Sequence, residues 1–271
     1  MGCRHDGVER AYPLRRPVPT GPQHAPALAL DPSPAVRVLI LIPAFNEAAT
    51  LPGLVAEIRS DAPAHDILVV DDGSDDETRA LLPALGVRWI RLPERLGPGA
   101  AVRVGLRYAR QRGFDAVVRL DGDGQHPARL LPALIEPLMN RRADVVIGSR
   151  FTHARRSPST PRGRRVVQRC LGMILTILTR GRVTDPTSGL WAFGPQALAV
   201  LAEHHPSGYP EPELRLFLSR NQLRAVEIPV TMRERPAGQT SLTARRTTAA
   251  MARLIIHLLV VPLRGAVRDR T

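Results

Sequence analysis

Lysine is absent from this 271-residue sequence, and all 38 of its basic residues are arginines. With 25 acidic residues the formal net charge is +13. A guanidinium group binds phosphate through two parallel hydrogen bonds, so this composition favours phosphate-bearing partners. A basic nucleic-acid-binding protein is one class with such a charge. Aromatic residues, on which unpaired bases would stack, make up only 4% of the chain, and no nucleic-acid-binding module is recognisable. We therefore expect no nucleic-acid partner and keep that class as a remote alternative.

Cysteines and long apolar runs are also scarce. Cys3 and Cys170 are the only cysteines, which excludes a disulfide framework or a cysteine-rich zinc site and fits a reducing compartment. No uninterrupted apolar run approaches the roughly 18 residues of a membrane-spanning helix. The first residues, MGCRHDG, lack the hydrophobic segment of a signal peptide. We expect the protein to be made and kept in the cytoplasm.

The pattern of apolar residues changes sharply at Val36. Residues 1–35 are rich in proline, arginine and alanine without apolar periodicity, and we predict a disordered N-terminal extension. Beyond them, short apolar runs typical of strands (36–42, 66–70, 87–92, 115–120 and 144–150) alternate with helical patterns (46–60, 77–85, 98–113 and 127–142). This alternation predicts an α/β fold with a mostly parallel sheet flanked by helices. Ligands bind such sheets beyond the carboxyl ends of the strands.

Polar clusters stand where three of these strands end: Asn46 with Glu47, Asp71 with Asp72, and Asp121 with Asp123. The last pair lies in LDGDGQH (120–126), and side chains two residues apart in an extended segment point to the same side. Two adjacent carboxylates repel each other unless a positive charge lies between them. A divalent cation that also holds phosphate oxygens would supply it. A solvated Asp-Gly turn is the simpler alternative for this heptapeptide taken alone.

Six motifs occur in one order along the chain: IPAFNE (42–47), VVDDGSDD (69–76), DGDGQH (121–126), GSRF (148–151), DPTSGLWAF (185–193) and VEIPVTMRERPAGQTS (226–241). Together they resemble the family-2 glycosyltransferases of GT-A fold. The branch that looks most similar is that of the dolichyl- and polyprenyl-phosphate sugar transferases. The resemblance places a glycosyltransferase domain at residues 36–243.

By resemblance, the ends of the first two strands bind the nucleotide base and ribose, and Asp121 reaches the ribose and phosphates. Asp123 would bind Mg²⁺ or Mn²⁺, with Asp121 and Gln125 as further metal ligands, and the cation would neutralise charge on the departing nucleoside diphosphate. Arg150 would lie near the donor and Arg235 would hold a phosphate, although either could be a surface charge. The implied donor site comprises Pro43, Phe45, Glu47, Val69, Asp71, Asp72, Asp121, Gly122, Asp123, Gln125, Arg150 and Arg235.

The acceptor is less clearly indicated. Where the polyprenyl-phosphate branch often has a lysine, this chain has Ser241 in GQTS, and only Arg245 or Arg246 nearby could replace its charge. A hydroxyl acceptor would need a general base, for which Glu213 or Glu211 are candidates. A lipid phosphate is already ionised and needs none. Both glutamates could instead simply favour a helix N-terminus.

The resemblance implies that Asp123, Glu213 and Arg150 are the catalytic residues. Asp185, in DPTSG, lies in a family motif near the acceptor, and a helix-capping or loop role is the alternative.

Arginine-rich segments predict contact with a membrane surface. Residues 150–182 contain nine arginines, no carboxylate and an apolar helical face, which suits an interface with anionic lipid. A helix packed on the domain core is the alternative. Residues 244–271 are predicted to form an amphipathic helix on the membrane surface.

We therefore predict an inverting, metal-dependent glycosyltransferase that moves a sugar from a UDP- or GDP-linked donor to a polyprenyl phosphate. It would be peripheral on the inner face of the cell membrane. A family-2 enzyme acting on a hydroxyl acceptor, such as a glycan or secondary metabolite, is the alternative.

Overall fold

The computed structural model describes residues 36–152, 162–206 and 210–233. The predicted N-terminal extension and C-terminal amphipathic helix lie outside the described residues. So do Arg235, Ser241, Arg245 and Arg246.

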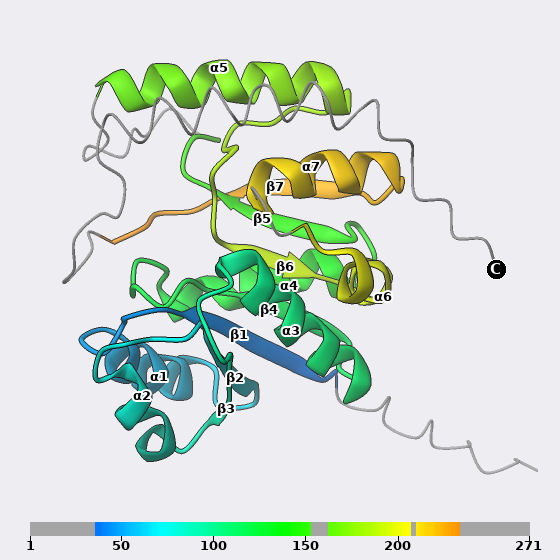
Figure 1. Ribbon diagram of the computed structural model, residues 1–271. Coiled ribbons are helices and arrows are strands. Elements are labelled where there is room, and N and C mark those ends of the chain that lie inside the picture. The colour runs from blue at the N-terminus through cyan, green and yellow to red at the C-terminus, as the bar shows by residue number, and fades with distance from the viewer. Residues whose placement is uncertain (1–35, 153–161, 207–209, 234–271) are drawn as a thin grey trace, which may run out of the picture. The chain divides into compact units, whose positions relative to one another are not determined.

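The described residues contain a seven-stranded sheet in the order β3-β2-β1-β4-β6-β5-β7 (Figure 1). Only β6 runs antiparallel to its neighbours, β4 and β5. The prediction of an α/β fold with a mostly parallel sheet is confirmed. The strands are β1 (Val38–Ala44), β2 (Asp66–Asp71), β3 (Arg88–Arg91), β4 (Ala116–Arg119), β5 (Val145–Ser149), β6 (Trp191–Phe193) and β7 (Ala225–Pro229).

Helices cover both faces of the sheet, which explains why β1 is apolar at every position. Val38, Ile40 and Ile42 pack on one face, and Leu39 and Leu41 pack on the other. The first face carries α1 (Leu51–Asp61), α2 (Thr78–Leu81) with the 3₁₀ turn Leu82–Leu85, and α4 (Leu131–Met139) after the 3₁₀ turn Ala128–Leu130. The second face carries α3 (Pro98–Gln111), α6 (Pro195–His204) and α7 (Pro210–Arg220).

Helix α3 approaches the sheet closely because Gly105 faces it. A Cβ atom at Gly105 would lie 2.2 Å from a methyl carbon of Leu41 on β1. Val102, Leu106 and Ala109 continue the buried stripe at helical spacing. Gly113 ends the segment with a left-handed φ of 68°, so that the chain can turn into β4.

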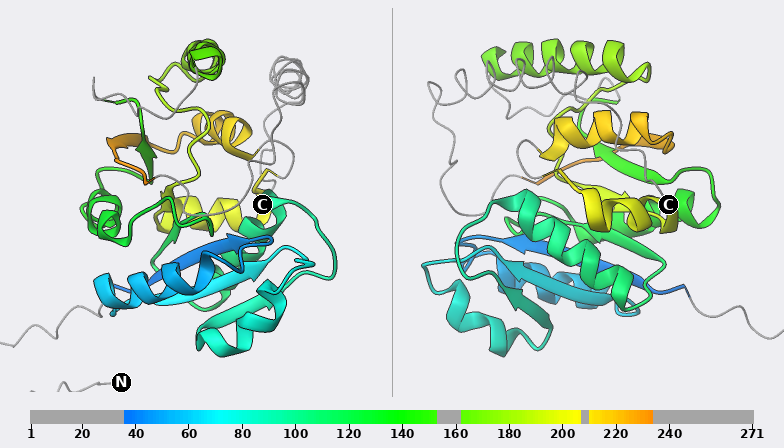
Figure 2. Two further views of the ribbon diagram at one scale, coloured as in Figure 1. Left: turned by 90° about the vertical axis from the view of Figure 1, so that its left-hand side faces the viewer. Right: turned by 45° about the vertical axis from the view of Figure 1, so that its right-hand side comes forward.

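Helix α5 (Arg162–Thr179) lies outermost and packs on α7, as Figures 1 and 2 both show. Leu171 and Leu175 form its buried side, in contact with Leu216 of α7. On the other side Met173 and Ile177 are 63% and 70% exposed. The helix therefore packs on the domain, as in the alternative interpretation, and it also presents an apolar stripe outwards. No helix among the described residues is long and apolar enough to cross a membrane.

Candidate active site

The loops that follow β1 and β2 are joined through Asn46, which adopts a left-handed φ of 56°. Its side-chain amide donates to Asp75 at 2.6 Å and accepts from the Asp75 N–H at 3.1 Å. Its own N–H donates to Ser74 Oγ at 3.0 Å. These hydrogen bonds hold the loops at the ends of the first two strands together.

Asp71 and Asp72, expected to bind the base, are both buried and both have partners within the protein. Asp71 accepts hydrogen bonds from the N–H and the hydroxyl of Ser74, and it forms an ion pair of 2.6 Å with Arg91. Asp72 accepts the N–H groups of Leu96, at 2.8 Å, and Gly97. These carboxylates shape the loops around the site, and their contact with a nucleotide stays a prediction. Val69 has a fully buried side chain in the core.

Glu47 and Gly122 bring the end of β1 against the DGDGQH loop. The Thr50 hydroxyl oxygen lies 2.9 Å from Glu47 Oε2 and 2.8 Å from the Gly122 carbonyl oxygen. A Cβ atom at Gly122 would lie 3.3 Å from the Pro43 carbonyl oxygen, a tight contact that glycine avoids. Close by along the chain, the Arg95 guanidinium lies 4.0 Å above the Phe45 ring. The predicted donor residues of β1 and β4 are therefore neighbours.

Asp121 is held as a carboxylate by two basic side chains. Arg119 Nη2 lies 3.0 Å from Oδ1, and His126 Nε2 lies 3.6 Å from Oδ2. Burial raises the pKa of Asp121, but Arg119 and His126 lower it by more than burial raises it. The pKa of Asp121 is therefore well below its usual range. The carboxylate therefore stays ionised at any physiological pH.

Asp123, two residues after Asp121 in the sequence, is almost buried, and its Oδ1 accepts the Gln125 N–H at 3.0 Å. Among the described residues, no three His, Cys, Asp or Glu side chains are arranged to hold a metal ion. Two carboxylates and the Gln125 amide offer only oxygen ligands from the protein. That set fits Mg²⁺ or Mn²⁺, because such ions are often held by one or two carboxylates together with substrate phosphates.

Arg119 is a site residue that the sequence analysis missed. It lies in β4 and is 4% exposed, and its Nη2 contacts both Asp121 and Glu211 Oε1, the latter at 3.1 Å. Burial opposes its charge, but Asp121 and Glu211 outweigh burial and raise the pKa of Arg119. The signal was an arginine inside an apolar strand, two residues before Asp121 and therefore on the same side.

Arg119 and Asp121 form a cluster with one glutamate of α7, Glu211. Glu211 and Glu213 are two residues apart, which turns their side chains about 200° from each other on a helix. Glu211 contacts Arg119. The role of Glu213 as a base stays a prediction.

Arg150, at the end of β5, is locked by Asp185. The guanidinium forms two hydrogen bonds of 2.7 Å with the fully buried carboxylate, and the Arg150 N–H donates to it at 3.1 Å. Burial opposes the charge, but Asp185 and, more weakly, Asp121 raise the pKa of Arg150. We call this pair the Arg150–Asp185 clamp. Arg150 is thus a fixed cation whose field reaches Asp121, and Asp185 acts by holding it.

Gly189 of DPTSG is a second residue whose role the sequence did not reveal. A Cβ atom there would lie 1.9 Å from Asp121 Oδ2. The backbone before β6 thus lies directly against the Asp121 carboxylate.

Residues 39–200 match the family model described as "Glycosyl transferase family 2". The undecaprenyl-phosphate mannosyltransferase of Micrococcus luteus is 32% identical over 77% of this chain and 88% of its own length. The polyprenol monophosphomannose synthase of Mycolicibacterium smegmatis is 30% identical over 80% of this chain and 85% of its own. Among solved structures, glucosyl-3-phosphoglycerate synthase from Mycobacterium tuberculosis, in complex with Mn²⁺, UDP and glucosyl-3-phosphoglycerate, aligns with a TM-score of 0.60 at 25% identity. That alignment covers 84% of this chain and 80% of the other.

Proposed function

The chain belongs to glycosyl transferase family 2 and has the GT-A fold, and we propose that it transfers a sugar, with inversion, from a UDP- or GDP-linked donor to a polyprenyl phosphate. The observation that carries the proposal is the Asp121–Asp123 pair at the carboxyl end of β4, with Asp121 kept ionised by Arg119 and His126. The acceptor is supported by the two relatives named for undecaprenyl phosphate and polyprenol, which align over most of their length.

The residues of the site have separate tasks in this reaction. Asp121, Asp123 and Gln125 would hold Mg²⁺ or Mn²⁺, which would offset the charge that develops on the leaving nucleoside diphosphate. Arg150 presents a guanidinium fixed by Asp185, and a fixed cation stabilises developing charge without reorganising. Catalysis would rest on Asp123 and Arg150.

The acceptor phosphate supplies its own nucleophile. One of its ionised oxygens attacks the anomeric carbon opposite the diphosphate, so the new carbon–oxygen bond forms as the bond to the diphosphate breaks. No proton has to be removed from the attacking atom, and no general base is needed. The anomeric configuration inverts in this single displacement.

The outer side of α5 supports a membrane contact. Met173 and Ile177 are exposed one helical turn apart, and Arg169 on the helix and Arg180 just after its end are exposed near them in the sequence. An apolar stripe with nearby arginines favours the surface of an anionic bilayer. There a lipid-linked phosphate would reach the enzyme at the cytoplasmic face of the membrane.

A hydroxyl acceptor is the second candidate, and the contact of Glu211 with the Arg119–Asp121 cluster favours it. An acid at this place could take a proton from a sugar hydroxyl. Glu213→Gln tests the base expected from the sequence. A severe loss of turnover with unchanged donor affinity would point to a hydroxyl acceptor.

The deciding experiment measures nucleoside diphosphate release by the full chain in detergent. A panel of UDP- and GDP-sugars is tested with and without a polyprenyl phosphate, in Mn²⁺, Mg²⁺ or EDTA, with Asp123→Ala as the inactive control. Release that requires both the cation and the lipid supports the proposal and identifies the donor. Cation-dependent release that ignores the lipid would refute the acceptor. Full activity of Asp123→Ala would refute the metal assignment.

A further inference from the structure

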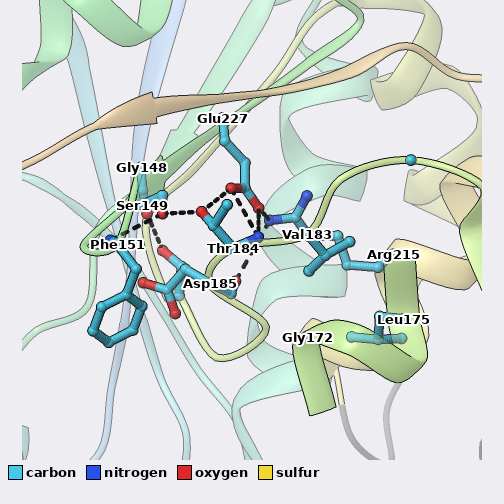
Figure 3. Close-up of polar contacts among 12 residues, drawn as sticks. Gly148, Ser149, Phe151, Gly172, Leu175, Val183, Thr184, Asp185, Arg215 and Glu227 are labelled. Atoms are coloured by element: carbon cyan, nitrogen blue, oxygen red, sulfur yellow. Dashed lines mark hydrogen bonds and ion pairs between the residues drawn. The ribbon is translucent and has the colours of Figure 1, made fainter. Parts of the chain in front are cut away.

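Glu227, on β7, lies at the centre of a nearly buried hydrogen-bond network close to Asp185 (Figure 3). Its carboxylate accepts the N–H of Thr184 at 3.1 Å and also the Thr184 hydroxyl. The guanidinium of Arg215, on α7, forms an ion pair with the same carboxylate. Segments from three parts of the chain therefore meet at one charge.

The carboxylate sets the direction of the two hydroxyl hydrogen bonds in this network. An ionised carboxylate can only accept hydrogen bonds, so the Thr184 hydroxyl donates its hydrogen bond to Glu227. The Ser149 hydroxyl, 2.6 Å from Thr184 Oγ1, must then be the donor in that contact. Ser149 Oγ in turn accepts the Phe151 N–H at 3.2 Å. The donors thus run in one direction, from Phe151 through Ser149 and Thr184 to Glu227.

This chain of hydrogen bonds joins the two segments that carry the clamp. Ser149 precedes Arg150, and Thr184 precedes Asp185. The Ser149–Thr184 contact joins these two segments one position away from the clamp itself. The position of the Arg150 guanidinium therefore depends on both segments keeping their register.

Arg215 makes the network a charged one. Burial lowers the pKa of Arg215, and Glu227 raises it without fully offsetting burial. The guanidinium also lies 5.3 Å from the Trp191 ring of β6. Removing the carboxylate would leave this cation buried without its main partner, which is strongly unfavourable. The Arg215–Glu227 ion pair also joins α7 to β7, and the test must separate this purely structural role from the positioning of Arg150.

We propose that Glu227 is a positioning residue, which holds the Arg150 guanidinium in register through Thr184 and Ser149. It touches no reacting atom. This inference rests on the proposed function in one respect, that Arg150 contacts a phosphate during transfer. A displacement of about 1 Å in such a group costs on the order of a hundredfold in rate.

Thr184 offers the sharpest variants because its hydroxyl is the link between Glu227 and Ser149. Thr184→Val keeps the shape and the backbone N–H and removes only that hydroxyl, and Thr184→Ser restores it. We expect Thr184→Val to lower kcat about tenfold or more, with Glu227→Gln at least as impaired. Thr184→Ser should stay near the wild-type value. The dissociation constant of the nucleoside diphosphate is measured beside kcat, because Arg150 is itself one of the predicted donor residues and its displacement would also weaken binding of the diphosphate.

Asp144→Asn is the matched control: Ser149 and Glu227 belong to the paired strands β5 and β7, and Asp144 lies just before β5, at the other end of that pair. Its Oδ2 accepts the Arg224 N–H at 2.8 Å beside the start of β7. This variant should lower the melting temperature and leave kcat unchanged. A purely structural role for Glu227 predicts the same behaviour for Thr184→Val, with kcat retained.

The experiment combines kcat, nucleotide binding and amide hydrogen exchange on the full chain. Faster exchange at residues 148–152 in Thr184→Val but not in Asp144→Asn, together with the loss of kcat, supports the proposal. The proposal would be overturned if Thr184→Val kept wild-type exchange at residues 148–152 or a wild-type kcat. An equal loss of kcat in Asp144→Asn would also overturn it. If the wild-type chain transfers nothing to a polyprenyl phosphate, the proposed function fails. The exchange comparison then decides the positioning network alone, since unchanged protection of 148–152 would refute it.

Discussion

Gly189→Ala should displace Asp121 without disturbing the fold. The new methyl carbon would begin 1.9 Å from Asp121 Oδ2, while real contacts of this kind are not shorter than 3.0 Å, so the carboxylate must move by at least 1.1 Å. Gly189 is not among the described glycines with positive φ, so alanine fits its backbone. A shift of that size would disturb the 3.0 Å contact between Arg119 and Asp121 Oδ1.

Two magnitudes follow from this displacement. Losing a charge-assisted hydrogen bond costs about 1.5–3 kcal/mol of stability, and a 1 Å misplacement of a catalytic group costs about a hundredfold in rate. We therefore expect kcat/KM to fall about a hundredfold while the protein still unfolds cooperatively.

The assay pairs sugar transfer with thermal unfolding, and Gly53→Ala is the control. Gly53 lies in α1 with nothing within 4 Å of its added Cβ, so alanine there should stabilise the chain by about 0.5–1 kcal/mol and leave the rate unchanged. A Gly189→Ala protein with wild-type kcat/KM would refute the role given to the position of Asp121.

Three further perturbations test other parts of the structure. Burial and the charge of Arg119 lower the pKa of His205 to about 3, so only the unfolded chain gains this proton between pH 6.5 and 3. The stability that this group contributes is fully present above pH 6.5 and decreases as the pH is lowered, by about 2 kcal/mol at pH 5. His205→Asn should remove that part of the dependence of the unfolding free energy on pH, measured by urea titration. Equal slopes in both proteins would contradict the burial argument. Met173→Glu with Ile177→Glu should weaken sedimentation with anionic vesicles while leaving transfer to a short-chain acceptor in detergent intact; unchanged sedimentation would exclude α5 as the contact. Glu211→Gln should keep most of the transfer to polyprenyl phosphate, whereas a loss of about a hundredfold would identify a general base.

The strands and their ends were predictable because the sequence encodes them locally. Residues 38–42 are apolar at successive positions, and the structure explains this by helices on both sides of β1. Strand β6 was not predicted: it has only three residues, WAF, too few for a period, and nothing local specifies that it runs antiparallel. β7 is partly exposed, so its alternation is weak.

The site was predictable where residues share a motif and hidden where they meet through the fold. Asp121 and Asp123 lie two positions apart in the sequence, whereas Arg119 and Glu211 are 92 positions apart. Arg150 and Asp185 stood in separate motifs, and only the structure shows that the second holds the first. The sequence suggested that Asp185 lies near the acceptor. In the structure its carboxylate is fully buried and paired with the Arg150 guanidinium, and a contact with the acceptor stays a prediction.

The direction of β6 explains why these motifs converge. Because β4 and β5 are both antiparallel to β6, they run the same way, and their carboxyl ends lie at one edge of the sheet with β6 between them. An antiparallel strand begins where its neighbours end, so the DPTSG segment enters β6 between Asp121 and Arg150. Gly189 then lies against Asp121 while Asp185 holds Arg150. A parallel β6 would place DPTSG at the opposite edge of the sheet, so the single reversed strand is what assembles the site.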